Sequence, residues 1–310
     1  MNKLLLVLLL IAGPALAFDP ADFSPPTTSR TTPQTFLIPG VDASWYTTQR
    51  GLNDFLPQVT TFDGRGQLLA SWTPNKKGVK NRPTFIVLHG GHGIGGQEVS
   101  NAQWARDELG ANVLILDSFW SRGRLENWAT WNEFGANMRA LDSIAAGKFV
   151  LSQGVDPTSI YLMGESQGGW AVLRTMTDYP LLNQYNQMFR AGISLYPVCT
   201  TGGRYGRYYA PALGPYKNIV VVFTAGKDTA TPSSQCDSDI FTQATFWRHY
   251  PEATHAFDVP FLSRPNEDND GRCIRSMNVY NRYAICRDNA ATQDMRNAIK
   301  IMVNTLTPLR

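Results

Sequence analysis

A series of short apolar runs, separated by segments with helical periodicity, constrains the fold of this chain more than any other feature. The runs lie at residues 85–88, 113–116, 160–163, 193–196, 219–223 and 245–250. The helical segments 133–153 and 291–306 each repeat apolar residues on one face. In the second segment the predicted face consists of Ala291, Met295, Ala298, Met302 and Leu306. Buried strands that alternate with amphipathic helices are typical of parallel sheets covered on both sides. The sequence therefore predicts an α/β fold with a mostly parallel central sheet and helices on both faces.

The motif G-x-S-x-G, at residues 164–168, directly follows the predicted strand at 160–163 and precedes a helix-forming run. A strand that turns sharply into a helix holds a serine hydroxyl up at the turn, where a substrate and a base reach it. Glycines flank Ser166 because such a tight turn leaves little room for larger side chains. We therefore predict that Ser166 is a nucleophile.

An acid and a histidine follow Ser166 along the chain, each after a predicted strand. Asp228 comes just beyond the strand at 219–223, and His255 follows the strand that ends at residue 250. Functional residues collect at the carboxyl ends of strands in an open α/β sheet. An imidazole activates a serine hydroxyl by taking its proton, and a carboxylate holds that imidazole in the right tautomer. The sequence predicts a triad of Ser166, His255 and Asp228, and the fallback acids are Asp237, Asp239 and Asp258.

A glycine-rich segment at residues 89–96, here called the glycine loop, follows the predicted strand at 85–88. Its glycines fit the pattern G-x-G-x-x-G, and Asp117 ends the next strand, so a nicotinamide enzyme is one interpretation. The same position is where hydrolases of this architecture place half of their oxyanion hole. We favour that interpretation, in which the backbone N–H groups of Gly91 and Gln167 bind the developing negative oxygen. We therefore predict no cofactor.

The glycine loop also contains His89 and His92 at H-x-x-H spacing, and Asp117 would be a third donor for a metal. Two imidazoles in a strand-to-loop segment need not face the same way, so we predict no metal site. His92 is instead a candidate for lining the substrate pocket. We expect His249 to have a structural role, because it lies inside a predicted strand.

The first 17 residues have the pattern of a secretory signal peptide, with Lys3, an apolar stretch and small residues up to Ala17. The stretch is too short to span a bilayer. We predict cleavage after Ala17, a secreted or periplasmic protein, and no stable membrane insertion. Residues 18–35 are an expected Pro/Thr-rich leader, which leaves residues 36–310 as a single domain. A net charge of +3 without a basic stripe argues against a nucleic-acid partner.

The chain has four cysteines, and export gives them a structural meaning. An even number in an oxidising compartment favours disulfides over metal binding. Three connectivities are open from the sequence. We favour Cys273–Cys286, which closes a local loop, and Cys199–Cys236, which joins segments after two adjacent strands.

These motifs resemble those of the dienelactone hydrolase family of α/β-hydrolases, over about residues 83–306. The resemblance rests on five segments, at residues 88–91, 117–123, 164–169, 225–228 and 250–257. It implies an α/β-hydrolase fold, and it implies Gly91 and Gln167 as the oxyanion donors. The founding members carry a cysteine nucleophile, whereas this chain has Ser166, which suggests ordinary ester hydrolysis rather than dienelactone as the substrate.

Further pocket candidates are Glu165, Trp120 and Arg122. Glu165 precedes the nucleophile and either contacts substrate, orients a neighbouring side chain, or is a solvated residue of the turn. Trp120 and Arg122 follow the strand at 113–116, where they would bind an aromatic or acidic group of the substrate. A structural ion pair is the alternative for Arg122.

Together these features predict an exported serine hydrolase that cleaves small-molecule or polymer-linked carboxylic esters through an acyl-enzyme. A peptidase of the prolyl oligopeptidase kind has the same order of catalytic residues and is one alternative. A non-catalytic binding protein on a hydrolase scaffold is another, and its mark would be the loss of a triad residue. The sequence leaves the acyl and alcohol groups and the oligomeric state open.

Overall fold

The computed structural model describes residues 34–39, 67–119, 136–178, 182–199, 215–236, 238–260, 273–275 and 283–307. The expected signal peptide at residues 1–17 lies outside these ranges, as does most of the expected leader. The first described strand begins at Gln34, two residues before the expected start of the domain.

An eight-stranded sheet has the order β1-β2-β4-β3-β5-β6-β7-β8. Its strands are β1 (Gln34–Pro39), β2 (Gln67–Thr73), β3 (Thr84–Leu88), β4 (Asn112–Asp117), β5 (Ile160–Glu165), β6 (Ala191–Leu195), β7 (Ile219–Ala225) and β8 (Phe246–Tyr250). β2 pairs antiparallel with β1 and with β4, and the other neighbours pair in parallel. The predicted mostly parallel sheet is confirmed, and each of the six predicted apolar runs corresponds to one parallel strand.

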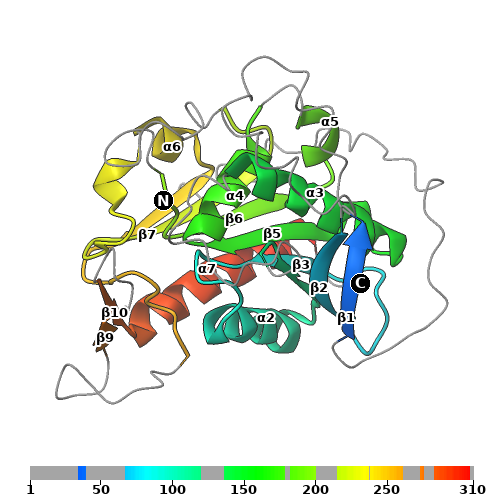
Figure 1. The fold of residues 1–310 in the computed structure, drawn as a ribbon, viewed down its shortest axis with the longest axis horizontal. Coiled ribbons are helices and arrows are strands. Elements are labelled where there is room, and N and C mark those ends of the chain that lie inside the picture. Colours follow the sequence, from blue (N-terminus) through cyan, green and yellow to red (C-terminus); the bar gives the residue numbers. More distant parts are fainter. Residues whose placement is uncertain are drawn as a thin grey trace.

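Helices cover both faces of this sheet (Figure 1). The longer ones are α2 (Gly96–Leu109), α3 (Ala136–Ser152), α4 (Gln167–Met176) and α7 (Asn289–Leu306), and the short ones are α5 (Asn183–Asn186) and α6 (Ser238–Gln243). α3 and α4 lie on one face, whereas α2 and α7 lie on the other (Figure 1). Because side chains alternate along a strand, β3 sends Ile86 and Leu88 to the first face and Phe85 and Val87 to the second.

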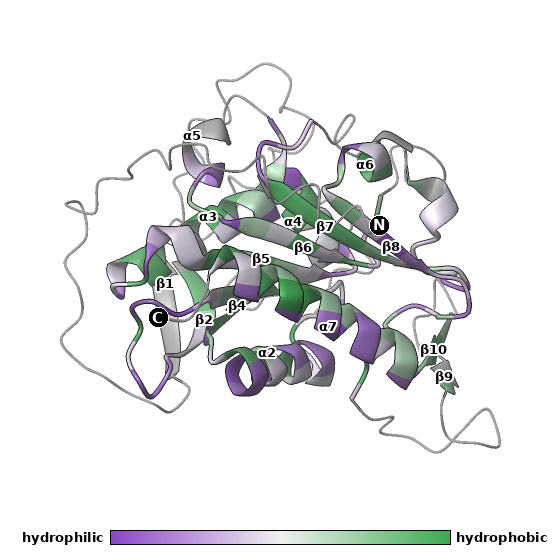
Figure 2. Ribbon diagram, turned by 180° about the vertical axis from the view of Figure 1, so that it is seen from behind, coloured by the Kyte–Doolittle hydropathy of each residue, from purple (hydrophilic) through white to green (hydrophobic). Residues whose placement is uncertain are grey.

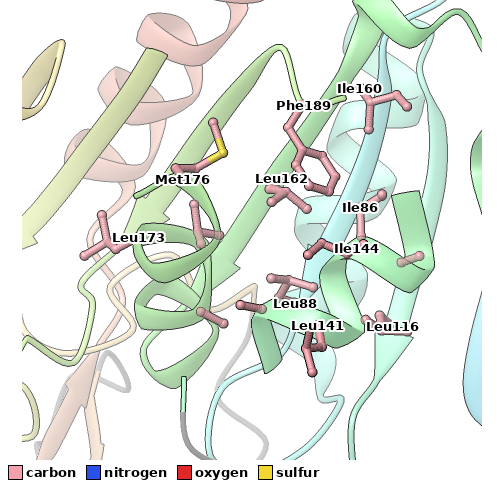
Figure 3. Close-up of a cluster of buried hydrophobic side chains, with 14 of the residues drawn as sticks. Ile86, Leu88, Leu116, Leu141, Ile144, Ile160, Leu162, Leu173, Met176 and Phe189 are labelled. Atoms are coloured by element: carbon pink, nitrogen blue, oxygen red, sulfur yellow. The ribbon is translucent and has the colours of Figure 1, made fainter. Parts of the chain in front are cut away.

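Two hydrophobic cores result, one on each side of the sheet. The core under α3 and α4 includes Leu141, Ile144 and Leu173 of the helices together with the strand residues Leu88 and Leu162 (Figure 3). The strands are mostly hydrophobic, whereas α7 alternates between hydrophobic and hydrophilic residues (Figure 2). These two apolar cores hold the helices against the sheet. The candidate site lies at the carboxyl ends of the strands that they support.

The last helix, α7, differs from the prediction in its buried face. Asp288 caps its N-terminus by accepting a hydrogen bond from the N–H of Ala291 at 2.9 Å. The buried stripe runs through Met295, Ile299 and Val303. Ala291 and Met295 of the predicted stripe are buried, whereas Ala298 and Met302 are only partly buried against the same core, because Ile299 and Val303 occupy the fully buried positions beside them.

Both predicted disulfides are present. Cys199, after β6, is bonded to Cys236, after β7. Cys273 is bonded to Cys286 across a two-stranded hairpin of β9 (Cys273–Arg275) and β10 (Ala284–Cys286). Within the described ranges, no helix combines the length and the apolar composition that crossing a membrane requires.

Candidate active site

Ser166 lies at a sharp turn between β5 and α4. Its backbone has φ 53° and ψ −113°, in a region that residues with a Cβ atom rarely adopt. Backbone hydrogen bonds hold this conformation: the N–H of Ser166 donates to Leu195 O at 2.9 Å, and Ser166 O accepts from the N–H groups of Trp170 and Val198, each at 3.1 Å. A strained conformation that the surroundings fix in this way is a frequent property of functional sites.

The glycines of the turn are required by close backbone approach. A Cβ atom on Gly168 would lie 2.2 Å from the carbonyl oxygen of Leu88, and one on Gly164 would lie 2.3 Å from the carbonyl oxygen of Gly168. The absence of side chains lets the start of α4 pack directly against the end of β3. The glycine loop and Ser166 are therefore close neighbours.

His255 and Asp228 form a buried, hydrogen-bonded pair. Asp228 lies just after β7 and His255 just after β8, and the two strands are neighbours in the sheet. The Nδ1 of His255 lies 2.7 Å from Oδ2 of Asp228, and both side chains are almost fully buried. With Nδ1–H donating to the carboxylate, Nε2 holds the lone pair that a base needs.

Asp228 is itself held by its own turn. Its Oδ1 accepts from the N–H groups of Ala230 and Thr231, each at 2.8 Å. Burial raises the pKa of Asp228, but the charge and hydrogen bond of His255 and the hydrogen bonds from Thr231 outweigh burial and lower it overall. The carboxylate is therefore ionised and points at the imidazole.

Ser166 and His255 line one cavity of about 270 Å³. The glycine loop forms one wall, and Val259, Tyr283 and Ile285 are among the residues that form another. Like Ser166, the cavity residues Tyr196 (φ 34°) and Ala256 (φ 55°) have a positive φ. The structure thus places all three predicted triad residues just after the carboxyl ends of β5, β7 and β8, with the serine and the histidine on the same cavity.

The two predicted oxyanion donors lie at this cavity or next to it. Gly91 is part of the lining. Gln167 is the first residue of α4, directly after Ser166. The N–H groups in the first turn of a helix are not used by the helix's own hydrogen bonds, and they favour negative charge.

Arg139 is a supporting residue that the sequence did not identify. It lies on α3, is 1% exposed, and donates to the carbonyl oxygen of His89 at 2.5 Å and to Oε1 of Gln167 at 3.3 Å. Its guanidinium also lies 5.3 Å from the ring centroid of Phe119. One cation therefore links the start of the glycine loop to the residue after the nucleophile.

His92 lines the cavity as predicted, and its Nε2 lies 3.3 Å from the hydroxyl of Tyr283. Burial, together with the nearby His255, lowers the pKa of His92 to about 4. His92 is therefore neutral at neutral pH. Tyr283 also packs edge-on against His255, with ring centroids 5.1 Å apart.

Glu165 is buried, so the expectation of a solvated residue of the turn is wrong. It is 1% exposed and lines the cavity next to Ser166. Its Oε1 accepts from Nδ2 of Asn101 at 2.8 Å. Asp258, one of the fallback acids, belongs to the same cluster: it accepts from Asn101 at 2.6 Å and from the Tyr196 hydroxyl at 2.8 Å. Asp258 is therefore not the acid that pairs with His255, since that hydrogen bond is made by Asp228.

The histidine of the glycine loop, His89, faces inward. Its Nδ1 lies 2.6 Å from Gly90 O and its Nε2 accepts from the N–H of Ser118 at 3.0 Å, so both ring nitrogens have protein partners. No group of three metal-binding side chains gathers anywhere in the described residues. His249 lies in β8, exposed, with Nδ1 3.0 Å from the Thr224 hydroxyl.

Some predicted residues lie outside the described part of the chain. They are Trp120, Arg122, Asp237 and the side chain of Asp239.

The dinucleotide interpretation meets a physical obstacle at the start of α2. In such folds the pyrophosphate lies at the helix N-terminus and binds its N–H groups. Here the carboxylate of Glu98 occupies that position, with Oε2 accepting from the N–H of Gly95 at 2.8 Å and Oε1 from the N–H of Gly90 at 3.0 Å. A second anion would be repelled there.

Comparison with solved structures identifies the architecture. A Klebsiella pneumoniae protein named as a dienelactone hydrolase matches 76% of this chain and 92% of its own, with 13% identity and a TM-score of 0.57. A dienelactone hydrolase-like promiscuous phosphotriesterase from metagenomic libraries matches 88% and 98%, with 12% identity and a TM-score of 0.56. The fold is that of the α/β-hydrolases.

A thermophilic esterase from the planctomycete Thermogutta terrifontis has the same fold, with 15% identity, a TM-score of 0.54 and coverage of 80% of this chain and 91% of the esterase. No protein-family model matches the chain, and no curated protein matches it in sequence. The likeness is therefore one of fold, and the argument for function comes from the residues of the site.

Proposed function

We propose that this chain is an exported serine hydrolase of the dienelactone hydrolase kind, which cleaves carboxylic esters through an acyl-enzyme. The observation that carries the proposal is the buried hydrogen bond of 2.7 Å between His255 and Asp228, with Ser166 in a strained turn on the same cavity. These are the three groups that convert an alcohol into a nucleophile at neutral pH. The three neighbours described above, named as a dienelactone hydrolase, a phosphotriesterase and an esterase, support the reaction class.

In the proposed first step, Nε2 of His255 takes the proton of the Ser166 hydroxyl while Oγ attacks the carbonyl carbon of the ester. Asp228 stabilises the imidazolium that forms, because its carboxylate is ionised and bonded to Nδ1–H. The tetrahedral intermediate then collapses, and the leaving alkoxide takes the proton from His255. Water attacks the acyl-enzyme with the same histidine as base, which releases the acid and restores Ser166.

The negative oxygen of each tetrahedral intermediate would be bound by the backbone N–H groups of Gly91 and Gln167. Removing one such donor costs about 3–4 kcal/mol in other hydrolases. Arg139 supports this arrangement, since it contacts both the carbonyl of His89 and the side chain of Gln167.

Export is the second part of the proposal. Both disulfides are formed, and disulfides persist mainly in oxidising compartments. Together with the signal-peptide pattern of residues 1–17, they favour a secreted or periplasmic protein. Mass spectrometry of the protein from the culture medium or periplasm tests this, and the mature chain is expected to begin at Phe18.

Ester turnover tests the catalytic part of the proposal. The assay compares p-nitrophenyl esters of increasing acyl length, acetylated sugars, feruloyl esters and peptide p-nitroanilides. We expect turnover of at least one ester class, loss of it in Ser166→Ala, and retention in Ser234→Ala, which removes an exposed serine. Turnover of peptides alone would favour a peptidase, and turnover that survives Ser166→Ala would refute the proposal.

A further inference from the structure

The glycine loop has few side chains of its own to hold it in place. Five of its eight residues are glycine, and ordering glycine costs more backbone entropy than ordering any other residue. It nevertheless lies against the nucleophile: a Cβ atom on Gly90 would be 3.5 Å from Cβ of Ser166 and 3.6 Å from the carbonyl oxygen of Glu165. Contacts from outside the loop must therefore hold it there.

Glu98 supplies two of these contacts. Its side chain projects from the first turn of α2, is 5% exposed, and accepts hydrogen bonds from both ends of the loop. Oε1 binds the N–H of Gly90 at 3.0 Å and Oε2 binds the N–H of Gly95 at 2.8 Å. One carboxylate thus joins the two ends of the loop that carries Gly91, and both bonds are strongest when Glu98 is ionised.

Two more carboxyl groups are buried beside Glu98. Asp258 is well supplied with donors: it accepts from Asn101 at 2.6 Å, from Tyr196 at 2.8 Å and from Gln97 at 3.2 Å. Glu165 has fewer donors: its Oε1 accepts from Asn101, and the Tyr196 hydroxyl is near enough to oppose the rise of its pKa, while its buried Oε2 has no hydrogen-bond partner among the described residues. Of the three carboxyl groups, Glu165 has the least support for a negative charge.

The charged groups around Glu165 do not supply the support for a negative charge that its own hydrogen bonds lack. The titratable and charged groups that face it from the packed elements are Glu98 on α2, Tyr196 after β6, Asp258 after β8 and Arg296 on α7. Arg296 contacts Asn101 at 3.0 Å and Ser100 at 3.2 Å, so its guanidinium approaches the cluster through Asn101. Three adjacent buried carboxyl groups with one nearby cation do not all ionise together.

We propose that Glu165 is a neutral carboxylic acid, and that its proton allows the ionised Glu98 to hold the glycine loop in position against Ser166. Burial, and then the neighbouring Glu98 and Asp258, raise the pKa of Glu165 well above its usual value. Burial also raises the pKa of Glu98, and the hydrogen bonds from the N–H groups of Gly90 and Gly95 limit that rise without cancelling it. Glu98 and Glu165 are positioning residues, and their role rests on the proposed function of Ser166.

The proposal predicts that the reactivity of Ser166 depends on pH through the ionisation of the neighbouring Glu165. When Glu165 loses its proton in alkaline solution, two adjacent carboxylates repel each other and the hold on the loop weakens. A displacement of about 1 Å in such a site lowers the rate about 100-fold. Glutamine in place of Glu165 keeps the shape of the neutral acid but has no proton to lose.

The test measures the rate at which a fluorophosphonate labels Ser166, because the phosphoryl oxygen of that reagent needs the same donors as an ester. We expect Glu98→Gln to slow labelling about 100-fold, since the new amide replaces one acceptor by a donor, and Glu108→Gln to match the parent. Glu108 is the matched control, because it lies on the same helix in an exposed pair with Lys300 at 3.2 Å. A parent-like labelling rate in Glu98→Gln would overturn the proposal, whereas a parent that takes no label would instead refute the proposed function.

The proton on Glu165 has two readouts of its own, which keep the proposal testable if Glu98→Gln does not fold. We expect the labelling rate of the parent to fall in alkaline solution and that of Glu165→Gln to remain constant. We also expect the infrared band of a protonated carboxyl group at neutral pH to disappear in Glu165→Gln. An unchanged band, or the parent's alkaline decline in Glu165→Gln, would overturn the assignment of the proton.

Discussion

Replacing Asp228 by Asn tests the hydrogen bond between Asp228 and His255 in the proposed mechanism, although Oδ2 of Asp228 also lies 2.9 Å from the Thr231 hydroxyl. The variant keeps Oδ1, which accepts from the N–H groups of Ala230 and Thr231 at 2.8 Å each, so the turn keeps its support. At the other position it presents an amide NH₂ to Nδ1 of His255, where the carboxylate accepted at 2.7 Å. Two donors cannot face each other, so the imidazole must carry its proton on Nε2 and cannot accept one from Ser166.

The size of the effect follows from that tautomer. The wrong tautomer lowers kcat about 10⁴-fold in a comparable triad, which corresponds to about 5 kcal/mol at 1.36 kcal/mol per factor of ten. The free energy of unfolding should fall by only about 1.5–3 kcal/mol, the value of one charge-assisted hydrogen bond. Steady-state hydrolysis of a p-nitrophenyl ester and urea denaturation measure the two quantities.

Asp294→Asn is the control for this experiment, because Asp294 is a partly exposed carboxylate that accepts from the Tyr250 hydroxyl at 2.8 Å and does not line the cavity. It should leave kcat within about twofold of the parent. A kcat for Asp228→Asn within about tenfold of the parent would refute the reasoning, since the tautomer of His255 would then not matter.

The same variant should change the dependence of stability on pH. The pKa of Asp228 is lowered in the folded state, because His255 and Thr231 outweigh the effect of burial. A carboxyl group of this kind stabilises the fold above its unfolded pKa of about 3.9, and the stabilisation is lost as the pH falls through the folded value. Urea denaturation below pH 4 should show that loss in the parent and a smaller one in Asp228→Asn.

Three further predictions concern the walls of the site. Gly168→Ala would place a Cβ atom 2.2 Å from the Leu88 carbonyl oxygen, so we expect about 1–3 kcal/mol lower stability by thermal denaturation and loss of esterase activity; a stable, active variant would contradict the close approach. Cys273→Ser with Cys286→Ser opens a loop with a sequence separation of 13, and should cost about 3 kcal/mol by denaturation and weaken the cavity wall; unchanged stability would refute that role. His92→Gln should leave the acid limb of the pH–rate profile in place, because the pKa of His92 is about 4; a shift of that limb would make His92 part of the base.

The sheet was predictable because its parallel strands are buried on both faces and therefore appear as uninterrupted apolar runs. The segment 219–223 is an example, and it forms most of β7. The turn at Ser166 was predictable because close backbone approach demands glycine at positions 164 and 168. Asp228 and His255 followed from the rule that function collects at strand ends.

The supporting residues were harder to predict, because their partners are distant in sequence and polar contacts leave no periodic pattern. Arg139 lies within a predicted helix, 50 residues from His89, and only the folded chain shows that the two meet. Glu98 left a weak signal: it lies three residues after Gly95, the spacing of a capping box at the start of a helix. Glu165 was ambiguous because its burial depends on Asn101 and Tyr196, which come from two other elements.

The most direct test of the central claim is to map where a fluorophosphonate attaches and how fast. The account predicts one labelled peptide, which contains Ser166, with labelling slowed at least about 1000-fold in both His255→Ala and Asp228→Asn and unchanged in His249→Ala. A folded parent that takes no label, a label on another serine, or a label on Ser166 that forms equally fast without His255 would contradict it.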